Sequence, residues 1–252
     1  MFGAEIETAI ASHALAEFPR EACGVVTPAG YRPLRNVAPD PEDAFDCAGE
    51  LAELQVEGLE ILALVHSHPH RPPERPACEG PSEEDMRQQL AMGVPWGLVL
   101  TDGVNCRPTL WWGPGVPIPP LEGRDFRHGP SGSDGRGDCY ALIKDWYQLE
   151  RGITLPEFPR DERWWEDRKD LYVRGFAGAG FERIGFEELQ PGDVVLAHVL
   201  SDQVNHGGIY VGNGLVLHHL AGKLSRTEPI GRWRQLVTYA LRHVGEGSAS
   251  VG

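Results

Sequence analysis

A short segment rich in proline and glycine divides this 252-residue chain into two parts of similar length. Residues 113–120 read GPGVPIPP and carry no charge. Proline fixes φ and resists both helix and central strand, so such a segment is typical of a semi-rigid spacer. A chain of this length can form two compact domains. We therefore expect a first domain at residues 1–114, a linker at 115–121 and a second domain at 122–252.

The composition is that of a folded, acidic chain. Hydrophobic residues make up 41% of it, and most of the formal net charge of −14 is carried before residue 119. No basic stripe is present to replace phosphate counterions, so nucleic acid is not an expected partner. The acidic first half could meet a basic partner, but a surface kept soluble by like charge is the better explanation.

The sequence shows neither a membrane span nor a signal peptide. No apolar run reaches the length of a bilayer, and the first residues lack a basic segment followed by an apolar one. We therefore expect no membrane insertion, and synthesis in a cytoplasm. The cysteines include no C-x-x-C pair, which argues against a disulfide framework and leaves room for a working thiol. They are Cys23, Cys47, Cys78, Cys106 and Cys139.

Apolar patterns and turn residues in the first half indicate an α/β order of elements. We expect helices at residues 4–17, 50–59 and 83–92, and strands at 23–27, 31–37, 61–68, 95–101 and 107–112.

One of these strands ends in a candidate metal site. His66 and His68 close an apolar run, and alternate residues of a strand face the same side, so both imidazoles can bind one ion. Asp85 follows in the first turn of an expected helix that Ser82 can cap. Two imidazoles and a carboxylate suit tetrahedral Zn²⁺ with one position open for water. A histidine pair alone is a weak signal, because histidines near strand ends are more often surface or core residues.

The surrounding residues strengthen this interpretation. H-S-H-P at residues 66–69 and P-S-x-x-D at 81–85, with E-x-C-G at 21–24, resemble the JAMM metallopeptidase motif. The resemblance implies that His66, His68 and Asp85 bind zinc, that Glu21 is the general base, and that Ser82 supports the oxyanion. The spacer between His68 and Asp85 is longer than the usual loop of that family, and Cys78 within it is a candidate adventitious ligand.

The second half is organised around Cys139. The glycine-rich segment 135–138 leads into an expected helix that begins at Cys139 and continues to about residue 150. At a helix N-terminus the partial positive charge stabilises a thiolate, and a neighbouring imidazolium would lower the thiol pKa further. The alternative is a small buried cysteine that packs as an apolar group. Downstream, a turn at residues 212–214 should form a hairpin that brings His206 and His218 onto adjacent strands.

These residues resemble the NlpC-type cysteine peptidases. The D-C pair before a helix and the N-H-x-x-I-Y-V-G-x-G pattern at residues 205–214 carry the resemblance. It implies that Cys139 is the nucleophile, His206 the general base and His218 the group that orients its imidazole. His219 is the main competitor for the third role.

Both motifs in this order, with a linker between them, resemble tailed-phage tail assembly proteins. The resemblance implies an α/β JAMM-like domain with a mixed sheet flanked by helices, followed by an α+β, papain-like NlpC-type domain. It implies hydrolysis of the peptidoglycan stem peptide by the second site, tail-tip proteins as partners, and synthesis in the host bacterium with a possible place in the virion tail tip. A structural assembly factor without turnover is the alternative. A cellular wall-remodelling hydrolase is disfavoured, because no export signal is present.

Overall fold

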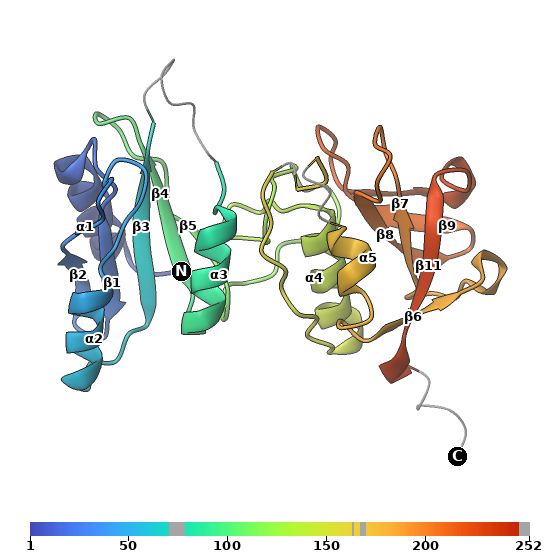
Figure 1. Cartoon of the computed structure of the whole chain (residues 1–252), viewed down its shortest axis with the longest axis horizontal. Coiled ribbons are helices and arrows are strands. Elements are labelled where there is room, and N and C mark those ends of the chain that lie inside the picture. Colours follow the sequence, from blue (N-terminus) through green and yellow to red (C-terminus); the bar gives the residue numbers. More distant parts are fainter. Residues whose placement is uncertain (71–78, 163, 167–169, 247–252) are drawn as a thin grey trace. The chain divides into compact units, whose positions relative to one another are not determined.

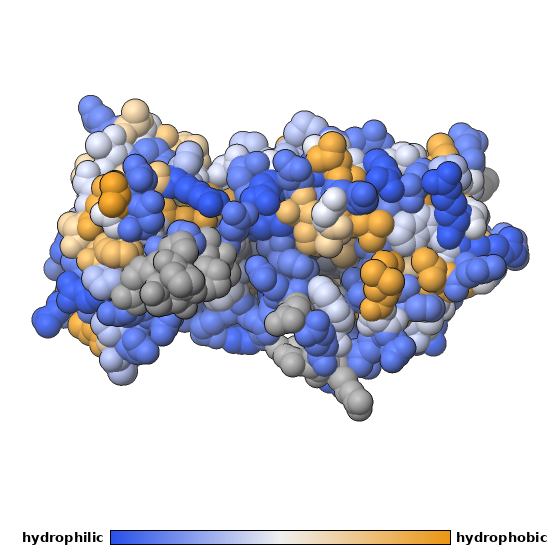
Figure 2. Space-filling model, turned by 90° about the horizontal axis from the view of Figure 1, so that it is seen from above, coloured by the Kyte–Doolittle hydropathy of each residue, from blue (hydrophilic) through white to orange (hydrophobic). Residues whose placement is uncertain are grey.

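The structure is a computed structural model that describes residues 1–70, 79–162, 164–166 and 170–246 (Figure 1). The candidate ligand Cys78 lies outside the described residues. On the face shown in Figure 2, hydrophilic residues surround small, separate apolar areas. Among the described helices, none combines the length and the apolar character needed to cross a bilayer.

The chain forms two units, each with its own sheet. One comprises Met1–Pro117 with Gly132–Asp134, and the other Ile118–Ser131 with Gly135–Gly252. Residues 113–120 contain neither helix nor strand. Residues Gly132–Asp134 join the first unit by contact with β5. There, Ser133 Oγ accepts a hydrogen bond from the Trp111 amide at 2.9 Å.

The first unit has a five-stranded sheet in the order β2-β1-β3-β4-β5. Its strands are β1 (Cys23–Thr27), β2 (Gly30–Leu34), β3 (Ala63–Pro69), β4 (Trp96–Thr101) and β5 (Leu110–Trp112). Its helices are α1 (Ala4–Glu17), α2 (Ala48–Val56) and α3 (Glu83–Met92). Strands β3 and β4 run parallel and the other neighbours antiparallel. This mixed sheet with its helices confirms the predicted α/β fold.

Alternation along β3 separates the two cores of this unit. Ala63 and Val65 pack with Ile10 of α1 on one face of the sheet. Leu64 packs with Leu54 of α2 on the other face. Because side chains two apart on a strand share a face, His66 and His68 point to the same side as Leu64.

Strand β2 ends earlier than the sequence predicts, at Leu34 instead of residue 37. The cause is Asn36, whose side-chain amide donates to the carbonyls of Glu21 at 2.8 Å and Ala44 at 2.9 Å. Its side-chain oxygen accepts from the backbone N–H groups of Ala38 and Asp46. A side chain thus supplies the hydrogen bonds that a longer strand ladder would have made.

The second unit has a six-stranded sheet in the order β10-β9-β8-β7-β11-β6, and its neighbours are antiparallel. The strands are β6 (Phe181–Ile184), β7 (Val194–Ala197), β8 (His206–Gly212), β9 (Leu215–His218), β10 (Arg226–Pro229) and β11 (Val237–His243). The helices are α4 (Cys139–Arg151) and the short α5 (Leu171–Gly175). Helices gathered on an antiparallel sheet confirm the predicted α+β class.

Helix α4 covers one face of this sheet and fixes where Cys139 lies. Asp138 caps the helix by accepting a hydrogen bond from the Ala141 amide at 2.9 Å, and Gly152 ends it with a φ of 65°. The apolar side of α4 packs on Ile209 and other residues of the sheet. The opposite sheet face packs on Trp233 and its neighbours. Cys139 is therefore held at the start of a helix that is anchored along its length.

Candidate active sites

In the first unit, β3 and α3 bring three candidate ligands together. His66 Nε2 lies 3.2 Å from His68 Nε2. Asp85 places Oδ1 3.2 Å from His66 Nε2 and Oδ2 3.4 Å from His68 Nε2. The sequence predicted these three residues as metal ligands, and they form a group whose ligand atoms lie within 4.8 Å of one another.

These separations fit a zinc ion. Zinc binds imidazole nitrogen and carboxylate oxygen at about 2.0–2.1 Å, and ligands at that radius in a tetrahedron are about 3.3–3.4 Å apart. The separation of the two imidazole Nε2 atoms and that between His66 Nε2 and Asp85 Oδ1, both 3.2 Å, match those tetrahedron edges. His68 Nε2 lies 3.4 Å from the other carboxylate oxygen, Oδ2. The donor set of two imidazoles and a carboxylate is one that catalytic zinc sites use.

Ser82 and Asp85 form a capping box at the start of α3. The Ser82 hydroxyl and backbone N–H donate to Asp85 Oδ2 at 2.8 and 2.7 Å, and the Asp85 N–H donates to Ser82 Oγ at 3.1 Å. Burial opposes ionisation of Asp85, but the two imidazoles hold the pKa of this carboxyl well below its usual range. In this structure Ser82 therefore orients the Asp85 carboxylate, a role that is separate from the oxyanion contact that the resemblance implies.

A cavity of about 250 Å³ joins Glu21 to these residues. It is lined by Glu21, His68, Ser82 and Asp85, among others. Glu21 lies two residues before the start of β1 and is 4% exposed. The cavity therefore collects the predicted base, two of the predicted ligands and the predicted serine in one place.

Ser67, between the two histidines, fastens β3 to the segment that carries Glu21. Its hydroxyl accepts a hydrogen bond from the Ala22 amide at 2.8 Å, and its own amide donates to the Ala22 carbonyl at 2.9 Å. Phe45 stacks on the His66 ring with centroids 4.7 Å apart. Neither contact was predictable from the sequence, because each joins chain segments that are distant in sequence.

In the second unit, the Cys139 thiol is buried. Its Sγ lies 3.1 Å from the Tyr172 hydroxyl oxygen, and the Gly207 backbone N–H hydrogen-bonds to it. Burial raises the pKa of the thiol to about 11, with a further contribution from the charge of Asp138. The hydrogen bonds from Tyr172 and Gly207 act in the opposite direction. The depressed thiol pKa that the helix N-terminus predicts is not found, because desolvation outweighs it.

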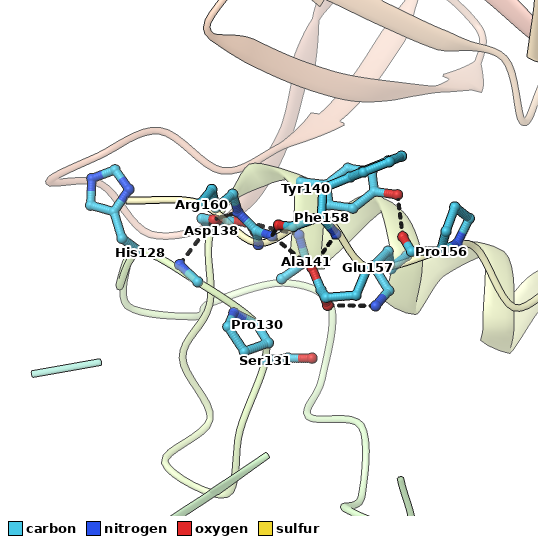
Figure 3. Close-up of polar contacts among 12 residues, drawn as sticks. His128, Pro130, Ser131, Asp138, Tyr140, Ala141, Pro156, Glu157, Phe158 and Arg160 are labelled. Atoms are coloured by element: carbon cyan, nitrogen blue, oxygen red, sulfur yellow. Dashed lines mark hydrogen bonds and ion pairs between the residues drawn. The ribbon is translucent and has the colours of Figure 1, made fainter. Parts of the chain in front are cut away.

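Asp138 and Arg160 form a buried ion pair beside the nucleophile (Figure 3). Arg160 Nε and Nη2 donate to the two Asp138 oxygens at 2.6 and 2.9 Å, and its Nη1 donates to Glu157 at 2.6 Å. Although burial opposes ionisation, Arg160 holds the pKa of Asp138 below its usual value. The carboxylate therefore keeps its charge while it caps α4, and Cys139 is held in a fixed position.

Strand β8 carries His206, and β9 carries His218. His206 Nε2 and His218 Nδ1 are 3.2 Å apart. Burial, and then the neighbouring His218 and His219, lower the pKa of His206 to about 3, so its imidazole is neutral at pH 7. The ring of His219 instead contacts Phe126, with centroids 5.1 Å apart. Of the two candidates for the third role, His218 is the one that lies beside His206.

Close packing of α4 on β8 brings the residue after His206 to the thiol. A Cβ added to Gly207 would come within 2.9 Å of Ile143 and 3.2 Å of the Tyr172 hydroxyl. A side chain at 207 would therefore press on Ile143 and on the Tyr172 hydroxyl, and glycine leaves room for the helix and the strand to approach this closely. The contact between Tyr172 and the nucleophile was not predictable from the sequence, because Tyr172 lies on a separate helix, α5.

Comparison with known proteins shows where the two units belong. Residues 3–112 match the prokaryotic homologs of the JAB domain, and residues 123–242 match the NlpC/P60 family. The tail tip assembly protein K of Escherichia phage lambda is 37% identical over 193 residues, which are 76% of this chain and 85% of that protein. The tail tip assembly protein K of Escherichia phage N15 is 34% identical over 235 residues, 90% of this chain and 89% of that protein. The chain belongs to the tail tip assembly protein K family.

Membership of the K family confirms the predicted phage tail protein with JAMM and NlpC-type domains. The first unit of this K-family chain is also similar to the probable TtuB-protein conjugate cleaving protease of Thermus thermophilus. The two sequences are 36% identical over an alignment of 105 residues, which covers 37% of this chain and 65% of that protein. Both domains thus belong to peptidase families.

Proposed function

We propose that this K-family protein is a peptidase with two active sites that works in a phage tail tip. The C-terminal site would hydrolyse the peptidoglycan stem peptide with Cys139, His206 and His218. The N-terminal site would hydrolyse an amide or isopeptide bond with zinc. The observation that carries the proposal is that His66, His68 and Asp85 lie close enough to share a metal ion, beside a cavity that Glu21, His68 and Asp85 line.

In the C-terminal site the thiol and the imidazole would both be neutral at rest, because the pKa of Cys139 is about 11 and that of His206 about 3. Attack of the Cys139 sulfur on a carbonyl carbon would therefore be coupled to proton transfer from the thiol to His206. His206 would then give this proton to the leaving amine as the C–N bond breaks. Water would hydrolyse the thioester and release the thiol and the acid.

In the N-terminal site, His66, His68 and Asp85 would hold the zinc. The bound metal would supply Lewis-acid chemistry and lower the pKa of water. Glu21, which lines the same cavity, would accept the proton from that water and pass it to the leaving amine. Ser82 would hold Asp85 in place, and its hydroxyl would support the oxyanion if its hydrogen turned from Asp85 toward the cavity.

The family match and the relatives support the substrate classes and the place of action. The NlpC/P60 match supports peptidoglycan as the substrate of Cys139. We propose a bond between D-glutamate and a diamino acid as the one cleaved. The name of the Thermus relative, a conjugate cleaving protease, supports a peptide or isopeptide substrate for the zinc site, such as a tail protein or its ubiquitin-like domain. The K proteins of phages lambda and N15 support the tail tip as the place of action.

The test of the C-terminal activity is incubation of the purified chain with stem peptides, with the products identified by mass spectrometry. Cys139→Ala should abolish cleavage, whereas Glu21→Gln should leave it unchanged. Cleavage that survives Cys139→Ala would remove Cys139 as the nucleophile. Cleavage lost in Glu21→Gln but kept in Cys139→Ala would assign stem-peptide hydrolysis to the other unit.

The metal proposal predicts about one zinc ion per purified chain, measured by inductively coupled plasma mass spectrometry. His66→Ala and Asp85→Ala should lose the zinc, because each removes one of three protein ligands. Glu21→Gln should keep it, because the ligands remain. His70→Ala is the matched control, since it removes a histidine just beyond β3 and should retain the metal. Full zinc occupancy in His66→Ala would refute the assignment.

The second candidate function is a tail-tip assembly factor without peptide hydrolysis at Cys139. The buried, neutral state of the thiol favours it, because such a cysteine can be a packing residue. A phage that carries Cys139→Ala separates the two functions. Normal tail assembly and normal infection would support the assembly factor. Normal assembly with a defect in cell-wall penetration would support the peptidase.

A further inference from the structure

Glu228 lies next to the His206–His218 pair. No sequence motif singles out this glutamate. It lies on β10, which pairs with β9, the strand of His218. Its Oε1 is 3.1 Å from His218 Nε2, on the side of that ring away from His206. The Glu228 side chain is 13% exposed and the His218 side chain 2% exposed. A carboxylate thus continues the row that begins at His206.

The Glu228 carboxylate is fixed on both of its oxygens. Trp233 Nε1 donates to Oε1 at 2.8 Å. Arg226 Nε and Nη2 lie 3.0 and 2.9 Å from Oε2. Every one of these neighbours is a hydrogen-bond donor, so the site accommodates the ionised carboxylate and not a second donor.

The two imidazoles are equally fixed. The Trp233 ring packs against the His218 ring with centroids 4.6 Å apart and against the His206 ring at 5.2 Å. The Trp233 ring therefore restricts the rotation of both imidazoles. What remains adjustable is therefore the position of the proton on each neutral ring.

A carboxylate at one end determines those positions. The negative charge of the ionised Glu228 carboxylate, 3.1 Å from His218 Nε2, favours a hydrogen over a lone pair on that nitrogen. In a neutral imidazole the other nitrogen, Nδ1, is then an acceptor. At 3.2 Å it receives the hydrogen of His206 Nε2. His206 is left with Nδ1 as its basic nitrogen.

We propose that Glu228 is a positioning residue that sets the tautomers of His218 and His206, so that Nδ1 of His206 is the base for Cys139. The inference rests on the proposed role of His206 in peptide hydrolysis. In the step concerned, one proton passes from the Cys139 thiol to His206 Nδ1 as the sulfur–carbon bond forms. The protons on both Nε2 atoms stay in place, and the Glu228 charge stabilises the imidazolium that results.

The direct test reads the tautomers by ¹⁵N NMR of the histidine rings in the full chain at pH 7. In the wild type, His206 and His218 should each carry the hydrogen on Nε2. Glu228→Ala should shift both rings toward a mixture that includes the Nδ1–H form. Glu228→Gln should keep the wild-type tautomers, because an amide oxygen can still accept from His218. Unchanged tautomers in Glu228→Ala would overturn the proposal.

The kinetic test uses stem-peptide hydrolysis. We expect Glu228→Ala to lower kcat about 10- to 100-fold with little change in KM, the scale seen when a carboxylate that orients a metal-bound imidazole is removed. Glu228→Gln should recover part of this loss. Glu122→Ala is the matched control, because Glu122 accepts a hydrogen bond from Thr227, the residue next to Glu228, without touching a histidine. A loss as large in Glu122→Ala as in Glu228→Ala would overturn the proposal.

The two readouts separate this inference from the proposed function. If the wild type cleaves no stem peptide but its tautomers respond to Glu228→Ala, the proposed function fails and the tautomer assignment stands. If the wild type cleaves and Glu228→Ala changes neither the tautomers nor kcat, the inference alone fails. If Glu228→Ala does not fold, Glu228→Leu, which fills more of the same space, replaces it in both measurements.

Discussion

Two side chains next to Cys139 have opposite effects on its thiol. The Asp138 charge and the burial of the thiol favour the neutral form, while the Tyr172 hydroxyl favours the thiolate by donating to it. Burial also raises the pKa of Tyr172 well above its ordinary value, so this hydroxyl keeps its hydrogen. A donor that enters from a different helix therefore offsets part of the effect of burial on the thiol pKa.

Replacement of Tyr172 by phenylalanine removes that donor while retaining the ring. We expect the thiol pKa to rise, because the hydroxyl hydrogen bond lowers it, and alkylation of Cys139 by iodoacetamide at pH 9 to slow several-fold. Mass spectrometry of the Cys139 peptide measures the rate. Phe158, Tyr172 and Cys139 line one apolar cavity. Phe158→Leu is the control and should leave the thiol pKa unchanged. A rate in Tyr172→Phe equal to the wild-type rate would mean that the hydroxyl has no influence on the thiolate.

At this scale, local patterns predicted some contacts and missed others. The alternation of a strand sufficed to put His66 and His68 on one face, and the capping residue placed Asp85 in the first turn of its helix. Tyr172 and Glu228 carry no such pattern. The contact of Tyr172 depends on where α5 packs, and that of Glu228 on the order of the strands in the sheet. No short segment of sequence encodes either.

Among the elements, α3 links local helix chemistry to the metal site. Its start at Glu83 and its end at Met92 agree with the sequence prediction, because Ser82 supplies the cap and Gly93, with a φ of 69°, the left-handed end. The same Ser82 hydroxyl holds the Asp85 carboxylate. The element that the sequence predicted best is therefore one whose boundary residues also orient a ligand.

Ser82→Ala tests this double role. It should lower the free energy of unfolding by about 1 kcal/mol through the lost cap. It should also weaken zinc binding about 10- to 100-fold, since Asp85 loses a hydrogen bond that orients it. Chelator competition measures the affinity and urea unfolding the stability. Ser82→Thr keeps a hydroxyl and should retain most of both. Wild-type zinc affinity in a destabilised Ser82→Ala protein would limit Ser82 to the cap.

For the whole molecule, each unit has its own cores, and the acid response should differ between them. Burial lowers the pKa of four histidines of the second unit: that of His206 to about 3, that of His219 to about 4, and those of His128 and His218 below their usual values. The proline-rich segment 113–120 predicts a division of the chain, and the structure forms two units. The return of residues 132–134 to the first unit was not predictable, because it depends on pairing with β5.

This histidine group predicts that the second unit loses stability as the pH falls below about 6.5. In the unfolded chain a histidine binds its proton near pH 6.5, whereas folded His206 and His219 do so only near pH 3 and pH 4. Between these values the unfolded state holds more protons, so acidification favours unfolding, and the stabilising contribution is complete above pH 6.5. Hydrogen exchange followed by mass spectrometry at pH 7 and pH 5 measures the opening of each unit in the intact chain. His219→Leu, which removes one buried imidazole outside the His206–His218 pair, should make the dependence on pH shallower by up to one proton. An equal dependence in His219→Leu and the wild type would show that His219 does not resist protonation in the folded chain.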